Sequence, residues 1–246
     1  MRRVYAYAPI AAFSYLASIA LVVIALPVQL VLLAVTAPFD RNRAVAGRFI
    51  RFLAVAISGT FPPWRLAVEG RWPGGGPFVV VANHQSMLDI LLLSRLPREM
   101  KWIAKASLFR VPWVGWMFSL AGDIPVRRGD AGSGGEALGK ARTYLARGMC
   151  VMVFPEGTRS ASGKLLPFKS GAFRLAIEAG VPVLPVAVSG TRRGLPKGNP
   201  WVRPCRARAR ILEPVPVAGY ALEDVTRLRD AVRERITAAL PSLPPA

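Results

Sequence analysis

Acidic side chains and histidine are scarce in this chain of 246 residues. It has 14 Asp and Glu against 33 Lys and Arg, for a formal net charge of +19, and it has a single histidine. Such a charge balance predicts an anionic partner: nucleic acid, an acidic lipid surface, or acidic substrates and carrier proteins. Because 52% of the residues are hydrophobic, the basic residues are dispersed, and the sequence has no recognised RNA- or DNA-binding motif, we expect an anionic membrane and no nucleic acid.

Cysteine is nearly absent as well. The two thiols, Cys150 and Cys205, cannot build a disulfide framework or a cysteine-rich zinc site. Cys150 falls in the apolar run MCVMVF, which predicts a buried small hydrophobic residue. The sequence therefore gives no reason to expect an oxidising compartment, and we expect no metal site.

Charge is missing altogether from the N-terminal region. No charged side chain lies between Arg3 and Asp40, and residues 10–37 are almost wholly apolar. This run is long enough to cross or deeply enter a bilayer and too long for the core of a signal peptide. Residues 43–59, basic at their start and apolar afterwards, suit a second arm. We therefore expect residues 1–60 to form membrane-associated helices, as one long helix or, by preference, a two-helix hairpin.

Basic residues flank this segment on both sides, so the positive-inside rule leaves a single crossing and a hairpin that enters and leaves by one face both open. We expect the remainder of the chain on the cytoplasmic side of the inner membrane. The flanking residues are Arg2, Arg3, Arg41, Arg43, Arg48 and Arg51.

Short apolar runs alternate with helical stretches after Pro62-Pro63. This alternation predicts an α/β domain over residues 61–246, with a mixed, largely parallel sheet covered by helices. Residues 108–120 are aromatic and apolar, and we interpret them as core rather than as a surface for acyl chains. We expect strands at 65–69, 78–82, 102–104, 123–126, 150–154, 183–188 and 206–212, helices at 86–96, 136–147, 171–179 and 221–240, and a glycine-rich loop before the helix at 136–147.

The only histidine, His84, stands five residues before Asp89. On one helix the two side chains would point about 140° apart, so they can meet only if His84 lies outside the helix. The apolar run ending at Ala82 and the Ser-x-x-Asp pattern from Ser86 predict a strand, a turn holding His84, and a helix with Asp89 in its first turn. A histidine oriented by a carboxylate in this way can act as a general base. The alternative is that Asp89 only caps the helix and His84 only donates to a turn carbonyl.

Three further clusters each follow or contain a predicted strand, and could meet at one rim of the sheet. In residues 154–160 (FPEGTRS), Gly157 permits close backbone approach and Arg159 offers paired donors, as in a phosphate cradle, although an ordinary polar turn has the same composition. Residues 122–128 (GDIPVRR) place two arginines in the loop after a strand, and the alternative is that these are ordinary solvated charges. Residues 181–186 (VPVLPV) place two prolines around an apolar strand, and the alternative there is an edge strand. Arginines 206, 208 and 210 likewise predict a solvated edge strand or a face on anionic lipid.

In this order, and after an apolar N-terminal segment, His-x4-Asp, Gly-x-Ile-x-Val-x-Arg, Pro-Glu-Gly-Thr-Arg-Ser and Val-Pro-Val-x-Pro-Val resemble the four motifs of the glycerolipid acyltransferases. The nearest resemblance is to bacterial 1-acyl-glycerol-3-phosphate (lysophosphatidic acid) acyltransferases. The motifs span residues 83–186. Many family members have an acidic residue where Arg127 stands, so the sequence departs from the pattern there.

The resemblance implies that His84 takes the proton of the free glycerol hydroxyl, that Asp89 orients His84, and that the alkoxide attacks an acyl thioester directly. The sequence has no Gly-x-Ser-x-Gly elbow that would indicate a covalent serine intermediate. No cofactor is implied, and acyl-CoA or acyl carrier protein would be the donor substrate. The phosphate of lysophosphatidic acid would be held by Glu156, Gly157, Thr158, Arg159, Arg128 and Lys105, and the acyl side would be lined by Val181, Pro182, Val183 and Pro185.

Two rivals remain at this point. An acyltransferase of the same family could act on another lysophospholipid or a lyso-aminolipid. A non-catalytic basic protein that docks on membranes would account for the charge alone, and would bind anionic vesicles without consuming a thioester.

Overall fold

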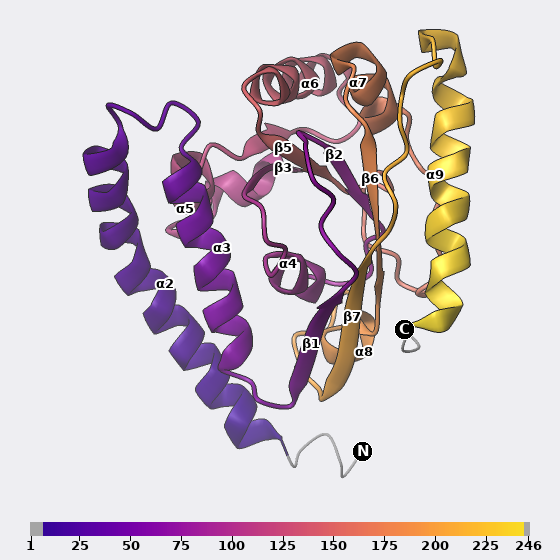
Figure 1. The fold of residues 1–246 in the computed structure, drawn as a ribbon. Helices are drawn as coiled ribbons and strands as arrows, with labels where there is room; N and C mark the ends of the chain where they lie inside the picture. The colour runs from indigo at the N-terminus through magenta and orange to yellow at the C-terminus, as the bar shows by residue number, and fades with distance from the viewer. Residues whose placement is uncertain (1–6, 244–246) are drawn as a thin grey trace.

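The computed structural model describes residues 7–243, and the predicted flanking residues Arg2 and Arg3 lie outside that range. The N-terminal region forms two helices, α2 (Ala8–Thr36) and α3 (Ala44–Gly59), joined by a short turn. Figure 1 shows them side by side along one flank of the molecule, with the C-terminal helix on the other. The region therefore has the two helices that were preferred over one, whereas their association with a membrane remains a prediction. By length and composition, α2 is long and apolar enough to cross a membrane.

The turn between the two helices is fixed by Asp40. Its carboxylate accepts hydrogen bonds from the backbone N–H groups of Ala44 (2.9 Å) and Val45 (2.7 Å), the first two residues of α3. A carboxylate at this place satisfies helix donors that have no partner within the helix. Within α2, buried Gln29 donates to the carbonyls of Ala46 and Met117, so polar contacts as well as apolar packing join α2 to its neighbours.

The remainder forms one sheet, which within the described residues has seven strands in the order β1-β7-β6-β2-β5-β3-β4. Within that part of the chain, β6 and β7 are the one antiparallel neighbour pair. The predicted mixed, largely parallel sheet is thus confirmed. Its strands are β1 (Trp64–Glu69), β2 (Val79–Ala82), β3 (Met100–Lys105), β4 (Ile124–Val126), β5 (Cys150–Val153), β6 (Val183–Ser189) and β7 (Cys205–Ile211).

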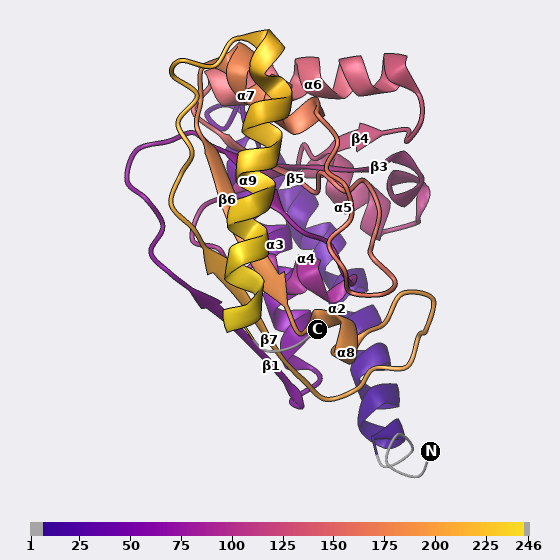
Figure 2. The same cartoon turned by 90° about the vertical axis from the view of Figure 1, so that its right-hand side faces the viewer.

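Helices cover both faces of the sheet, because the central strands alternate apolar side chains between two cores. In β2, Val79 and Val81 face the core beneath α6, α7 and α9, whereas Val80 and Ala82 face the core beneath α4. Figure 2 shows α9 along one face, with α6 and α7 beside its upper end. The bounds are α4 (Leu88–Leu93), α5 (Val114–Leu120), α6 (Ala131–Ala146), α7 (Gly171–Ala179), α8 (Thr191–Gly194) and α9 (Val225–Ala239), with 3-10 turns η1 (Ala106–Arg110), η2 (Leu222–Asp224) and η3 (Leu240–Ser242).

Two strands lie inside the sheet although sequence patterns suggested an edge: β7 was predicted as a solvated edge strand, and for β6 an edge strand was the alternative. β7 lies between β1 and β6, so the interpretation of its arginine face as an edge strand was wrong. Glu69 on the neighbouring strand β1 pairs with Arg208 and Arg210, and this cross-strand pairing neutralises part of that face. β6 lies between β7 and β2, although Pro185 within it has no N–H to donate. Burial on both faces therefore outweighs the charge and proline patterns that predicted edges.

The predicted helix at 86–96 and the predicted loop before residue 136 also required correction. The helix α4 is only six residues long, Leu88 to Leu93. The glycine-rich stretch at 131–135 is the start of α6 rather than a loop, because the Asp130 side chain accepts a hydrogen bond from Ser133 N (2.9 Å) and caps the helix. The segment at 108–120, predicted as core, is mixed: Met117 is buried between α2 and α3, but Trp113 and Trp116 stack on each other and are exposed.

Candidate active site

His84 lies in the turn between β2 and α4, as the spacing predicts. The preceding residue, Asn83, holds this turn against the end of β6: its side-chain amide donates to Val188 O (2.8 Å) and accepts from Val188 N (2.7 Å). The His84 carbonyl accepts a hydrogen bond from Ser160 N (2.8 Å). The backbone around the only histidine is therefore fixed by contacts with two other segments of the chain.

The His84 ring contacts the Asp89 carboxylate. Nδ1 of His84 lies 2.6 Å from Oδ2 of Asp89, and the same oxygen accepts hydrogen bonds from Gln85 N (2.7 Å) and Ser86 N (2.8 Å). Asp89 is fully buried and His84 is 6% exposed. With Nδ1 donating to a carboxylate, the lone pair of Nε2 is left to accept a proton. The predicted contact is confirmed, while the catalytic role of the pair remains a prediction.

Ser86 was expected to cap the helix, and its contacts are different. The hydroxyl accepts from Leu88 N (3.0 Å) in a tight local turn and donates to Leu195 O (2.6 Å), in the segment after α8. The return half of the capping pattern is present, because Asp89 accepts from Ser86 N. The carboxylate of Asp89 therefore both closes the turn and contacts the histidine.

Glu156, predicted to contact phosphate, instead accepts hydrogen bonds from the backbone of His84 and of a second loop. Oε1 accepts from His84 N (2.6 Å) and Oε2 accepts from Leu166 N (2.9 Å), and the residue is only 5% exposed. Burial raises the pKa of this carboxyl to about 7, although its two backbone hydrogen bonds act in the opposite direction. Phe154, two residues earlier, stacks on the His84 ring with centroids 4.0 Å apart and planes 16° apart. No sequence pattern predicted a role for Phe154 or for the Leu166 amide.

His84 lines a cavity of about 510 Å³ at the carboxyl ends of β3, β4 and β5, the rim at which the sequence clusters were expected to meet. Arg128 and Arg159 both line it. Burial, and then the positive charge of Arg159, lower the pKa of the Arg128 guanidinium, so the two cations are close enough to repel. An anion between them would relieve this repulsion. The basic residues lining the cavity are Lys105, Arg127, Arg128, Arg159 and Lys169.

Gly157 is required by its backbone and by its neighbour. Its φ is +67°, and a Cβ there would lie 3.0 Å from Cε of Lys169. Thr158, the next residue, is not among the residues that line the cavity, and its hydroxyl lies 3.4 Å from Nζ of Lys197. Lys197 also donates to Arg159 O (2.9 Å), so this lysine, which does not line the cavity, holds the backbone of the loop after β5. Four of the six residues predicted to hold phosphate therefore line the cavity, and Glu156 and Thr158 do not.

The fourth predicted motif lies away from this cavity. Val183 and Pro185 are buried within β6, and Val181 packs against the same core. None of Val181, Pro182, Val183 and Pro185 is among the residues that line the cavity. The apolar wall comes instead from β3 and the first turns of α6, a contribution hidden in the sequence by the glycine-rich composition of α6. The apolar lining includes Met87, Ile90, Trp102, Ile103, Leu108, Val126, Ala131, Ala137, Leu138 and Val153.

Comparisons with known proteins agree with this arrangement. The acyltransferase family model matches residues 65–189, about half of the chain. A 1-acyl-sn-glycerol-3-phosphate acyltransferase of Chlamydomonas reinhardtii is 36% identical over 94% of this chain and 68% of its own length. The human 1-acyl-sn-glycerol-3-phosphate acyltransferase alpha is 39% identical over 69% of this chain and 61% of its own.

The fold has a solved counterpart. The crystal structure of the 1-acyl-sn-glycerophosphate (LPA) acyltransferase PlsC from Thermotoga maritima matches with a TM-score of 0.78 at 29% identity, and the match covers 98% of both chains. The agreement therefore extends over the two N-terminal helices as well as the sheet. From the family match, the relatives and the fold, this protein belongs to the acyltransferase family, among O-acyltransferases related to the 1-acyl-sn-glycerol-3-phosphate acyltransferases.

Proposed function

We propose that this protein transfers an acyl chain from an acyl thioester, acyl-CoA or acyl carrier protein, to the free hydroxyl of 1-acyl-glycerol-3-phosphate, and so forms phosphatidic acid. The observation that carries the proposal is the His84–Asp89 pair opening on a cavity that is cationic on one side and apolar on the other. A lysophosphatidic acid has one anionic end, one apolar chain and one hydroxyl between them, and these three parts match the three parts of the site.

In the proposed reaction, Nε2 of His84 accepts the proton as the hydroxyl oxygen attacks the thioester carbonyl. The C–S bond then breaks and the thiolate leaves. The imidazolium of His84 then gives its proton to the thiolate, which regenerates the base. A thiol has a pKa near 8.5, so the thiolate is a good leaving group and the transfer needs no cofactor. The 2.6 Å contact with Asp89 keeps the proton on Nδ1 and stabilises the imidazolium. A positioned base of this kind contributes about 10²- to 10⁴-fold.

The phosphate would lie between Arg128 and Arg159, with Lys105 and Lys169 nearby. Guanidinium groups bind phosphate oxygens in pairs, and charge-assisted hydrogen bonds are about twice as strong as neutral ones. The repulsion between Arg128 and Arg159, which both line the cavity, supports an anionic ligand there. A lyso-aminolipid has no phosphate to offset that repulsion, which disfavours it as the acceptor.

We also propose that the catalytic domain covers residues 61–246 and acts at the cytoplasmic face of the inner membrane, with residues 1–60 entering the bilayer. The wide apolar surface that α2 exposes supports this location: Phe13, Leu16 and Ile24 are each about two thirds exposed. Large exposed apolar surfaces of this kind indicate contact with a membrane or a partner. Lipid substrates would then reach the cavity without leaving the membrane surface.

The test is thiol release by purified protein supplied with acyl-CoA or acyl carrier protein and lysophosphatidic acid. The His84→Ala variant should lose about 10²-fold or more of kcat while it binds lysophosphatidic acid normally. Full turnover in that variant would refute the assignment of the base. A panel of lysophospholipids and a lyso-aminolipid, run with the same donor, decides the acceptor, and lysophosphatidic acid should have the highest kcat/KM.

A further inference from the structure

A second cavity, of about 360 Å³, lies toward the start of β3, beside the catalytic cavity, and Trp102 in the middle of that strand lines both. The Lys105 end of β3 faces the catalytic cavity, whereas Met100, at the start of the strand, lines the second one. Its walls are one side of α3, with Arg48 and Phe52, and the turn between α4 and β3. A smaller hollow of about 160 Å³ shares Arg48 with it. The proposed acyl transfer uses none of the arginines that line this second cavity.

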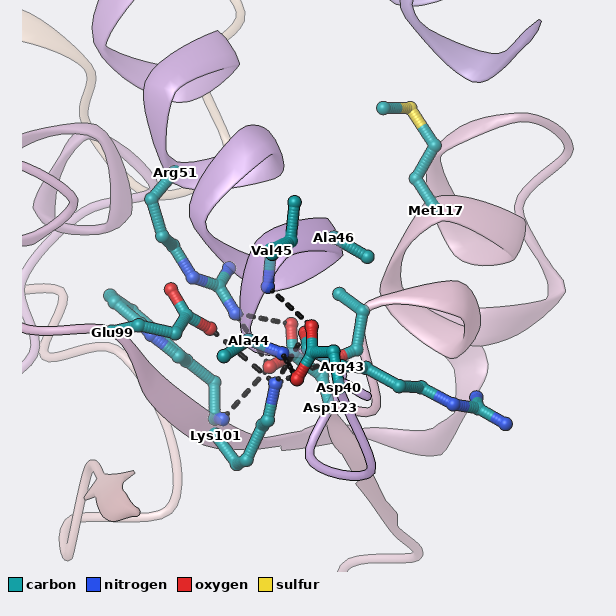
Figure 3. A network of polar contacts seen from close by, with 12 residues as sticks. Asp40, Arg43, Ala44, Val45, Ala46, Arg51, Glu99, Lys101, Met117 and Asp123 are labelled. Atoms are coloured by element: carbon teal, nitrogen blue, oxygen red, sulfur yellow. Dashed lines mark hydrogen bonds and ion pairs between the residues drawn. The ribbon is translucent and has the colours of Figure 1, made fainter. Parts of the chain in front are cut away.

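The buried charges beneath this cavity are paired with each other. One Arg51 nitrogen, Nη2, lies 2.5 Å and 2.6 Å from the two oxygens of Asp123, and Lys101 Nζ lies 3.6 Å from Glu99. Figure 3 shows the four side chains gathered between α3 and the sheet. Arg51 is 8% exposed and lines the cavity, and its Nε has no hydrogen-bond partner among residues 7–243. A buried donor without a partner is costly, so it favours an incoming acceptor.

Three more arginines line the cavity, and their charge is not compensated. Arg48, Arg95 and Arg98 make no ion pair with a carboxylate within the described residues. Two of them are held in place by neutral groups: Arg95 donates to the Ser58 hydroxyl (2.7 Å), and Arg98 donates to Gly75 O (3.0 Å). These three arginines give the cavity an excess of positive charge, which fits an anion.

The rim of the cavity is apolar on the side of the membrane-directed helices. Phe52 on α3 is 69% exposed, and Val55, one turn further along, also lines the cavity. An anion with an attached hydrocarbon would place its charge on the arginines and its chains over this helix. A soluble anion would leave Phe52 and Val55 uncovered.

We propose that this second cavity binds the phosphate group of an acidic phospholipid, at a site separate from catalysis, and thereby sets how α3 and the sheet lie on an anionic membrane. The proposal rests on the membrane location proposed above and is independent of the acyl transfer step. The lipid need not react, because His84 does not line this cavity.

The test uses the full-length protein in neutral detergent micelles, with phosphatidylglycerol, phosphatidylcholine or inorganic phosphate added in separate titrations. Lipids bound per chain are counted by native mass spectrometry, and the thermal midpoint is followed in parallel, since a ligand that binds only the folded state raises it. The test variant is R48Q/R95Q/R98Q. The control is R65Q/R142Q/R206Q, which removes the same charge from exposed positions outside both cavities.

We expect wild type and control to bind phosphatidylglycerol saturably, and the test variant to bind it about tenfold or more weakly, because each lost charge-assisted contact is substantial. Binding at the catalytic cavity is common to all three proteins and cancels in the comparison. Equal affinity in the test variant overturns the site, and so does an equal loss in the control. If wild type binds phosphatidylcholine as tightly as phosphatidylglycerol, the charge argument is overturned. If it binds inorganic phosphate as tightly, the claim that the ligand is a lipid is overturned.

Catalysis gives an independent reading. In neutral micelles the test variant should keep the kcat for thiol release, because none of its three arginines lines the catalytic cavity. On vesicles that contain phosphatidylglycerol its rate should fall below that of the control. An equal rate on such vesicles overturns the proposed orienting role, and the result leaves the His84 test of acyl transfer unaffected.

Discussion

Replacing Glu156 with glutamine keeps the shape of the side chain and exchanges one acceptor oxygen for an NH2 group. Oε1 and Oε2 each accept one backbone N–H, from His84 and from Leu166, so the variant must leave one of these buried donors facing another donor. At pH 8, above the raised pKa of about 7, the wild-type side chain is a carboxylate and both hydrogen bonds are charge-assisted.

The magnitude follows from those contacts. Loss of a hydrogen bond to a charged group costs about 1.5–3 kcal/mol, and for a chain of this size 1 kcal/mol shifts the melting temperature by about 2–4 °C. We therefore expect the melting temperature of Glu156→Gln to fall by about 3–12 °C. If a similar free energy is lost from the position of the His84 ring, kcat falls by about 10- to 100-fold. The KM for lysophosphatidic acid should not change, since Glu156 does not line the cavity.

The assay is steady-state thiol release at pH 8 with varied lysophosphatidic acid, together with a thermal melt in the same detergent. Glu223→Gln, at an exposed position outside the motif region 83–186, is the matched control. A manyfold higher KM with kcat retained would refute the reasoning, because it would mean that this carboxylate contacts the substrate, as the sequence alone had predicted. An unchanged melting temperature would refute the bracing contacts themselves.

Three other perturbations test other parts of the structure. Asp89→Asn should lower kcat by about 10²- to 10⁴-fold with little change in KM, because Nδ1 of the histidine loses the carboxylate that holds its proton; kinetics near wild type would contradict this. Arg159→Ala should raise the KM for lysophosphatidic acid about tenfold or more, whereas Arg142→Ala, outside the cavity, should leave it unchanged. Burial raises the pKa of Glu99 to about 7 from an ordinary 4.5. Its protonated form is therefore favoured in the fold, and its stabilising contribution is complete below pH 4.5 and lost as pH rises through 7. The free energy of unfolding in urea at pH 4.5, minus that at pH 8, should be about 3 kcal/mol more positive in wild type than in Glu99→Gln. The same value in both proteins would contradict a buried acid at this position.

Local patterns were sufficient wherever neighbouring residues decide the structure. The charge-free run before Asp40 predicted the long helix α2, and the basic start of residues 43–59 predicted α3 closely. The spacing of His84 and Asp89 predicted their contact, because a turn between strand and helix leaves few other arrangements for a pair five residues apart. Alternating apolar runs predicted the sheet, since strands buried on both faces need them.

Sequence patterns failed where distant segments compete for the same group. Glu156 looks like a phosphate ligand beside Arg159, yet the amides of His84 and Leu166 reach both of its oxygens first. The arginines of β7 suggest an edge, yet Glu69 of β1 pairs with two of them and covers the strand. Such outcomes depend on which strand becomes a neighbour, and composition does not specify that.

By itself, therefore, the sequence determined the apolar N-terminal helices, the α/β class, the contact between the histidine and its carboxylate, and the place of Arg159 in the loop after β5, because each depends on periodicity or on short spacing. Only the tertiary structure decided which cations share the cavity, that α6 supplies part of its apolar wall, and that Val183 and Pro185 are buried within β6 instead. It also brought the arginines of α3 and of the α4–β3 turn, about 50 residues apart, around one second cavity. The physical reason is that strand order and helix packing set the long-range distances on which electrostatic sites depend.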